Sequence, residues 1–498
     1  MSEMKKYEYR RQFIAGSHFR GENEYWQHID VAKNLKLSVH KDLPVQVIQR
    51  EEKQLFLLGY IIDPFHPDRT DADIIEWLFE KSADASTLIE NTYRLSGRWI
   101  LIYVDDGEIT FFHDPFGMRQ IYYAKVEGNI WCASDPAILA DYLNLKPDEE
   151  DEEKIKFIHS SAFEKKERFW VGDKTRYREI QHLLPNHYLE INTGFVHRYW
   201  MNNEPTISAD EAAKRAGDLL KGSLLSAKKR FNLMMPVTAG WDSRALLSAT
   251  KKIKDEIFYF ISTKNQLTEE DEDVKIPQKL FKKLRVDFHL LDNLKHPDED
   301  FLKTLHKNVD LARNLPKTLT FYEFYLNHQE KVNINGRGAE TARSYYPFEK
   351  NPAPEFLAKV TGYPNSEFVL EEINSWINET RPIISENNID MVDLYYWEQR
   401  MGNWGGTDPA EQDIAIEEFC PFNNRKLMMI LLSTNKKYRI RPNYRLHNMI
   451  ISYLWKDILR EPINPMPKLL YFKMLINSKI SSNLKSKIKR LLGMHPYD

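Results

Sequence analysis

The chain has 498 residues, of which 42% are hydrophobic and 29% charged, a composition typical of a folded protein of two or three domains. The 70 Lys and Arg residues nearly balance the 73 Asp and Glu residues, which argues against a nucleic-acid partner, and no run of about 18 apolar residues predicts a membrane span. Two cysteines, Cys132 and Cys420, exclude a disulfide framework and a cysteine-based zinc site; with no signal-peptide pattern at the N-terminus, we expect a cytoplasmic protein.

The first part of the chain is rich in expected β-strands. Apolar alternation predicts strands in five places: 44–62, which holds two short strands, 97–104, 108–113, 120–126 and 129–133. The turn Asp105-Asp106-Gly107 joins two of these strands and is typical of a β-hairpin. A helical pattern covers residues 71–81, and the segment 184–191 closes this part. We therefore expect an antiparallel β-rich domain over residues 1–205.

From about residue 206 onward, helices alternate with short apolar strands. Helices are expected over 209–229, 242–252 and 271–283, and strands over 233–237, 257–261, 286–291 and 332–335. Residues 350–498 are mostly helical in pattern, and 479–490 is expected to be a packed terminal helix. This alternation predicts an α/β domain over residues 206–498, with a parallel sheet whose ligands bind beyond the carboxyl ends of the strands. The whole chain is thus expected to combine α+β and α/β architecture.

The loop after strand 233–237 has the composition of a phosphate-binding loop. It reads Thr238-Ala239-Gly240-Trp241-Asp242-Ser243 and leads into a helix. Small residues let backbone N–H groups approach an anion, and a helix N-terminus adds partial positive charge. The loop lacks the lysine of the P-loop pattern. The pattern by itself also fits an ordinary strand-to-helix turn.

A second glycine-containing loop follows strand 332–335. It reads Asn335-Gly336-Arg337-Gly338-Ala339-Glu340. Because Mg²⁺ on a triphosphate takes one or two protein carboxylates, Asp242 and Glu340 are the expected metal ligands. The plainer interpretation is a glycine turn followed by a solvated glutamate.

Four segments, taken in order, resemble the asparagine synthetase B type amidotransferases and their relatives, the β-lactam synthetases and lasso-peptide cyclases. The loop 238–243 is similar to the S-G-G-x-D-S pyrophosphate loop of the N-type ATP pyrophosphatases. The other three segments are Leu95–Trp99 together with His113–Tyr123, Gly336–Tyr346 and Glu417–Leu427.

The resemblance implies a glutaminase-like first domain and a synthetase-like second domain. It implies an ATP-dependent ligase that adenylates a small-molecule or peptide carboxylate, releases pyrophosphate and joins the acyl group to an amine or ammonia. ATP and Mg²⁺ are the expected cofactors, with Asp242, Glu340 and Tyr346 as catalytic residues. The expected nucleotide-binding residues are Val237, Thr238, Ala239, Gly240, Asp242, Ser243, Asn335, Gly336 and Gly338.

Departures from the family leave several points open. Ser2 stands where glutamine-hydrolysing members have a nucleophilic cysteine, so we expect no glutaminase activity. Arg337 and Thr341 replace two acids of the family. The catalytic lysine has no clear counterpart among five nearby cations: Lys436, Lys437, Arg439, Arg441 and Arg445.

Two other functions remain open at this point. The altered loop residues are compatible with a nucleotide-binding protein that has lost catalysis. The same fold also serves sulfur-inserting or nucleotide-modifying ATP pyrophosphatases, which commonly use catalytic cysteines. The sequence does not identify the acid, the amine or the oligomeric state, although a homodimer is common among such enzymes.

Overall fold

The structure is a computed structural model, which describes every residue except 1–2, 20, 22–23, 202–203, 314–315 and 466–498. Ser2 and the expected helix 479–490 therefore lie outside the described residues. No helix among the described residues is long and apolar enough to cross a membrane.

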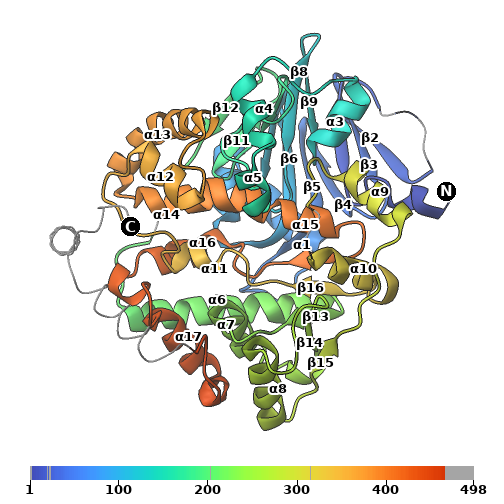
Figure 1. The fold of residues 1–498 in the computed structure, drawn as a ribbon. Coiled ribbons are helices and arrows are strands. Elements are labelled where there is room, and N and C mark those ends of the chain that lie inside the picture. Colours follow the sequence, from blue (N-terminus) through green and yellow to red (C-terminus); the bar gives the residue numbers. More distant parts are fainter. Residues whose placement is uncertain (1–2, 20, 22–23, 202–203, 314–315, 466–498) are drawn as a thin grey trace.

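Two six-stranded antiparallel sheets form the first part of the molecule, in the upper half of Figure 1. One sheet has the order β10 (Ile180–His182), β8 (Tyr122–Val126), β9 (Asn129–Ala133), β1 (Phe13–Gly16), β3 (Leu35–His40) and β2 (Trp26–Ala32). The other has the order β12 (Val196–Arg198), β11 (His187–Glu190), β7 (Glu108–His113), β6 (Ser96–Asp105), β5 (Lys53–Ile62) and β4 (Val45–Arg50). The expected antiparallel β-rich part is confirmed.

The apolar core of this part follows the two-residue period of the strands. Phe56 and Leu58 of β5 face the other sheet, whereas Leu55 and Leu57 face the outer helices. Two of these helices begin with capping boxes at Thr70 and Asp84. The helices of the first part are α1 (Asp71–Lys81), α2 (Ala85–Asn91), α3 (Pro136–Leu143), α4 (Glu152–Ile158) and α5 (Ser161–Lys165).

A five-stranded parallel sheet organises the second part, in the lower half of Figure 1. Its strand order is β15 (His289–Leu291), β14 (Phe258–Ser262), β13 (Leu233–Pro236), β16 (Val332–Ile334) and β17 (Glu417–Phe419). The chain moves outward from β13 in one direction and then returns to add β16 and β17 on its other side. The strand order therefore reverses between β13 and β16, the place where open α/β sheets bind their ligands.

Helices cover both faces of this sheet because successive strand residues point in opposite directions. Met235 and Tyr259 join the core beneath α6, α7, α8 and α17, and Met234 and Phe260 pack with residues of α9 and α10. These helices are α6 (Ala209–Arg230), α7 (Trp241–Ala249), α8 (Glu272–Leu284), α9 (Glu299–Asn308), α10 (Lys317–Asn327) and α17 (Arg445–Trp455). The remaining helices are α11 (Ala339–Ala342), α12 (Pro354–Thr361), α13 (Glu367–Asn387), α14 (Met391–Tyr395), α15 (Thr407–Gln412) and α16 (Arg425–Leu432), with a π-helix at Tyr396–Gly405.

The expected mixture of an antiparallel β-rich part and a parallel α/β part is thus confirmed. In the parallel sheet one strand was missed, because β17 has three residues and two of them are glutamates, which gives no apolar signal. In the antiparallel part, the strands that were not predicted are β1, β2, β3, β10 and β12. Two other elements are shorter than expected. The strand predicted over 286–291 covers only His289–Leu291, and the helix predicted over 242–252 ends at Ala249.

Buried ion pairs join the two parts of the chain. Nη1 and Nη2 of Arg98 on β6 each lie 2.6 Å from an oxygen of the Asp413 carboxylate. Nη2 of Arg119 lies 2.9 Å from Oε2 of Glu417, at the start of β17. Burial raises the pKa of Glu417, but the guanidinium groups of Arg119 and Arg98 outweigh it and hold that pKa at about 2. The contact between the two parts therefore contains buried, charge-assisted hydrogen bonds, whose bidentate geometry at Arg98 fixes the relative position of the two side chains.

Candidate nucleotide site

The two predicted loops meet at the reversal point of the parallel sheet. The first follows β13 and the second follows β16, which are neighbouring strands. Gly336 brings them into contact: a Cβ atom added there would lie 3.1 Å from Cβ of Asp242. A side chain at this position would push the two loops apart, which is the physical reason for glycine.

The loop between β13 and α7 is closed by its own hydroxyl groups. The Thr238 N–H donates to Ser243 Oγ (3.2 Å), the Gly240 N–H donates to Thr238 Oγ1 (3.1 Å), and the two hydroxyls lie 3.1 Å apart. The Ala239 N–H donates to the Asp273 carboxylate at 3.0 Å. The loop N–H groups that could bind an anion thus already donate to oxygen atoms of the protein. Gly240 is the N-cap of α7, and no side chain caps this helix.

A buried arginine fixes the base of this loop. Arg244, on the first turn of α7, is fully buried, and its Nε donates to the Thr238 carbonyl at 3.1 Å. Its Nη2 has no hydrogen-bond partner, and burial lowers the pKa of Arg244 to about 10. Among the described residues, a cavity of about 640 Å³ lies beside the loop and is lined by Trp241, Asn464 and the first turn of α17.

The expected metal ligands Asp242 and Glu340 lie together, with an arginine between them. Arg343 Nη2 is 2.6 Å from Asp242 Oδ2 and 3.7 Å from Glu340 Oε1. Burial and then the neighbouring Glu340 carboxylate raise the pKa of Asp242 to about 8, although Arg343 opposes both effects. The Arg343 guanidinium also stacks on the ring of Tyr444, 4.8 Å from its centre.

The donor set at this place fits Mg²⁺. Asp242 Oδ1 and Glu340 Oε2 are buried and have no hydrogen-bond partner. Among the described residues, no group of three or more His, Cys, Asp or Glu side chains is placed to hold a metal ion. A pair of carboxylates suits Mg²⁺ on a polyphosphate, because phosphate and water oxygens complete its octahedron.

The side chains of the second loop have different partners on either side of Gly338. Gly338 has φ of +85° and precedes α11, so that Ala339 and Glu340 turn toward α7. Arg337 points the other way and pairs with Asp408 and Glu418 (3.1 Å), below the loop. Arg337 thus belongs to a buried ion-pair cluster, and Thr341 is buried with its hydroxyl unpartnered.

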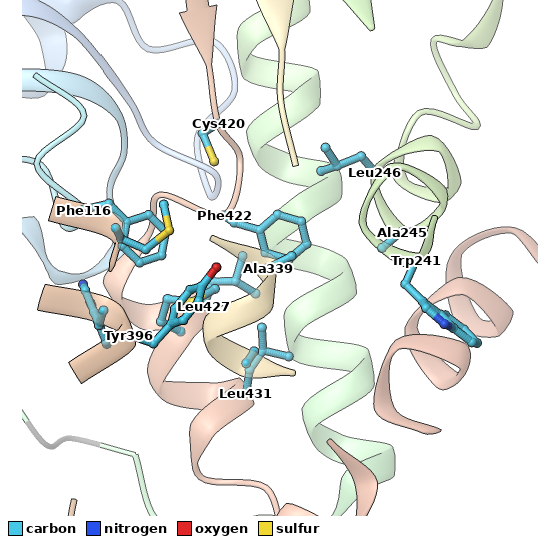
Figure 2. Close-up of a cluster of buried hydrophobic side chains, with 14 of the residues drawn as sticks. Phe116, Trp241, Ala245, Leu246, Ala339, Tyr396, Cys420, Phe422, Leu427 and Leu431 are labelled. Atoms are coloured by element: carbon cyan, nitrogen blue, oxygen red, sulfur yellow. The ribbon is translucent and has the colours of Figure 1, made fainter. Parts of the chain in front are cut away.

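Tyr346 lies in a group of tyrosines beside the carboxylates. It contacts Tyr395 and Tyr396, with ring centres 6.1 Å and 5.5 Å away, and it is almost fully buried. Burial and then the Glu340 carboxylate raise the pKa of Tyr396, which places that tyrosine near the site. Figure 2 shows Tyr396 and Ala339 in one apolar cluster with Phe116 from the first part of the chain and Leu246 from α7.

The five candidate cations of the C-terminal region have different partners. Lys436 pairs with Asp390 and Arg439 with Asp393, while Lys437 and Arg445 lie over the ring of Tyr438. Arg441 donates to the Tyr444 hydroxyl at 2.8 Å, and Tyr444 carries Arg343 on its ring. Of these five, Arg441 is therefore the one connected to the carboxylate pair through a shared residue.

Sequence reasoning missed three residues of this site: Arg343, Tyr444 and His447. Arg343 lies three positions after Glu340, a spacing that brings side chains together on a helical turn, so its position was the available signal. His447 is fully buried, both its ring nitrogens lack partners, and burial together with Arg343 lowers its pKa to about 3. No local pattern distinguishes it from a core histidine.

Comparisons with known proteins add little to this description. No family of known proteins matches the chain, and no curated protein matches it either. A glutamine phosphoribosylpyrophosphate amidotransferase from B. subtilis, in complex with ADP and GMP, is 10% identical over 60% of this chain and 90% of that chain, with a TM-score of 0.26.

Two further solved structures are similar to parts of the chain. An NH₃-dependent NAD synthetase from Campylobacter jejuni is 12% identical over 41% of this chain and 96% of that one, with a TM-score of 0.22. A glutamine-dependent NAD⁺ synthetase from Acinetobacter baumannii, in complex with ADP, is 9% identical over 58% of this chain and 76% of that one, with a TM-score of 0.14. Similarities this low do not establish a family, so the resemblance to asparagine synthetases stays a prediction.

Proposed function

We propose that this chain is an ATP-dependent ligase that joins a carboxylic acid to an amine through an acyl-adenylate. The observation that carries the proposal is the pairing of Asp242 and Glu340 at the reversal point of the parallel sheet, each in the first turn of the helix that follows one of two neighbouring strands. Each of these two residues has a carboxylate oxygen without a hydrogen-bond partner, and both lie near the N-terminus of α7. Such oxygens beside a helix N-terminus suit a polyphosphate that carries a metal ion.

In the first step, a carboxylate oxygen of the substrate attacks the α-phosphorus of ATP. The bond from that phosphorus to the bridging oxygen breaks, and pyrophosphate leaves. Charge builds up on the leaving group, where the N-terminus of α7 supplies a fixed positive potential. Asp242 and Glu340 would hold Mg²⁺, whose charge would offset that of the phosphates.

In the second step, an amine nitrogen attacks the acyl carbon, AMP leaves, and the nitrogen loses a proton. The chain has no predicted source of ammonia, because position 2 carries serine. The amine is therefore expected to come with its own substrate, and the acid and amine stay unidentified.

Exchange of labelled pyrophosphate into ATP tests the first step, because adenylation is reversible. With a panel of carboxylic acids, exchange should depend on the acid and should be lost in Asp242→Asn. Asp255→Asn is the matched control, since Asp255 is an exposed aspartate that pairs with Lys254 away from the site. Exchange that survives in Asp242→Asn would contradict the proposal.

A nucleotide-binding protein without turnover is the second candidate. The observation that favours it is the closed loop, in which Ser243, Thr238 and Asp273 already occupy the N–H groups that a phosphate needs. Binding of ATP without exchange with any acid would select it. Sulfur-transfer chemistry finds less support, because both cysteines are buried and burial raises the pKa of both thiols.

A further inference from the structure

The carboxylate pair already holds a cation, and that cation belongs to the chain itself. Arg343 lies 2.6 Å from Asp242 and 3.7 Å from Glu340, and only 12% of its side chain is exposed. One guanidinium does not satisfy the two acids. Asp242 Oδ1, Glu340 Oε2 and Arg343 Nε are all buried without hydrogen-bond partners.

The arginine and a metal ion would share one pair of carboxylates: Arg343 lies on Asp242 Oδ2 and Glu340 Oε1, whereas the oxygens without partners are Asp242 Oδ1 and Glu340 Oε2. Mg²⁺ binds oxygens at about 2.0–2.1 Å in an octahedron, and two cations facing one carboxylate pair repel each other. Metal entry therefore requires a new partner for the guanidinium. The planar fork of an arginine binds phosphate as well as it binds carboxylate, so a bound polyphosphate supplies that partner.

We propose that Arg343 is a specificity residue that keeps the Asp242–Glu340 pair closed to free metal ions and opens it to a metal ion bound to a polyphosphate, whose oxygens then receive the guanidinium. The inference rests on the proposed nucleotide site and goes beyond it, because it makes metal binding depend on the polyphosphate. Tyr444 provides the surface for the change, since its ring can keep contact with a guanidinium that rotates between the two partners.

Binding of Mn²⁺, followed by electron paramagnetic resonance, tests this dependence without any turnover. The wild-type protein should bind Mn²⁺ alone weakly and should bind it strongly when a non-hydrolysable ATP analogue is present. Arg343→Met should bind Mn²⁺ alone about tenfold more tightly or better, since one nearby positive charge has been removed. The same variant should bind inorganic pyrophosphate, in the presence of Mn²⁺, about tenfold more weakly.

Arg215→Met is the matched control, because Arg215 is an exposed arginine on α6 that pairs with Glu211. It should behave as the wild type in both titrations. Arg343→Lys guards against a folding defect: it keeps the charge and should retain weak binding of free Mn²⁺.

The outcomes separate this inference from the proposed function. If Arg343→Met binds free Mn²⁺ no better than Arg215→Met, while the wild type binds Mn²⁺ with the ATP analogue, the role of Arg343 is wrong and the nucleotide site stands. If the wild type binds neither Mn²⁺ nor the analogue under any condition, the nucleotide site itself is wrong and this inference falls with it.

Discussion

Gly338→Ala should destabilise the protein strongly, because two separate costs meet at this glycine. Its φ of +85° lies in the left-handed region, where an alanine costs about 1–2 kcal/mol. A Cβ atom there would lie 2.3 Å from Cε2 of Phe116, and such overpacking costs about 1–3 kcal/mol more. The expected loss in the free energy of unfolding is therefore about 2–5 kcal/mol.

Gly107→Ala is the matched control for the backbone cost alone. Gly107 has φ of +81°, and nothing lies within 4 Å of a Cβ atom added there. Thermal unfolding followed by tryptophan fluorescence should show a much smaller decrease in Tm for Gly107→Ala. The difference between the two variants, about 1–3 kcal/mol, measures the contact with Phe116.

A double-mutant cycle checks that Phe116 is the cause. In a Phe116→Ala background, Gly338→Ala should cost only about 1–2 kcal/mol, as Gly107→Ala does in the parent. Equal decreases in Tm for the two glycine variants would refute the reasoning, and so would a Gly338→Ala effect that does not change when Phe116 is removed.

Three further predictions concern the pKa of Asp242, the buried ion pairs and the residue at position 2. Burial and Glu340 raise the pKa of Asp242 to about 8, and metal binding needs its ionised form; binding of Mg²⁺ with an ATP analogue should therefore release protons, and affinity should rise with pH and level off above about 8. Calorimetry in two buffers of different ionisation enthalpy measures this release, and a release of the same size in Asp242→Asn would argue against it. Arg98→Met should destabilise the protein by about 3–5 kcal/mol because the buried Asp413 carboxylate loses its bidentate partner, whereas Arg50→Met, which removes a surface ion pair with Glu76, should cost about 1 kcal/mol or less. Equal shifts in the urea midpoint for these two variants would count against the buried network. Finally, the purified protein should release no glutamate from L-glutamine in an enzyme-coupled assay, because Ser2 stands where the family that the chain resembles has its nucleophilic cysteine; measurable release would overturn that expectation.

The sequence predicted those parts of the site that depend on neighbouring residues. Apolar runs marked β13 and β16, and the small residues that follow them marked the two loops, so Asp242 and Glu340 could be named as a pair. The parallel arrangement then brings the loops together, because both leave the same edge of the sheet.

What could not be predicted depends on contacts between distant segments. Arg343 was missed because its role comes from Asp242, 101 positions earlier in the chain. Tyr444 and His447 reach the site through the packing of α17 on α7, which no local pattern encodes. Strand β17 was missed because Glu417 pairs with Arg119 of the first part and Glu418 with Arg337 of the second loop, so neither position carries the apolar side chain that marks a strand.

The buried arginines of the first part make the two parts of the chain depend on each other. Arg98 and Arg119 neutralise Asp413 and Glu417, and Glu417 begins the strand that pairs with β16, the strand before the second loop. If residues 1–205 were removed, these acids would lie unpaired at the edge of the parallel sheet. The antiparallel part thus supplies the counter-charges of two buried acids of the second part, so that a change at Arg98 or Arg119 would act on the strand beside β16.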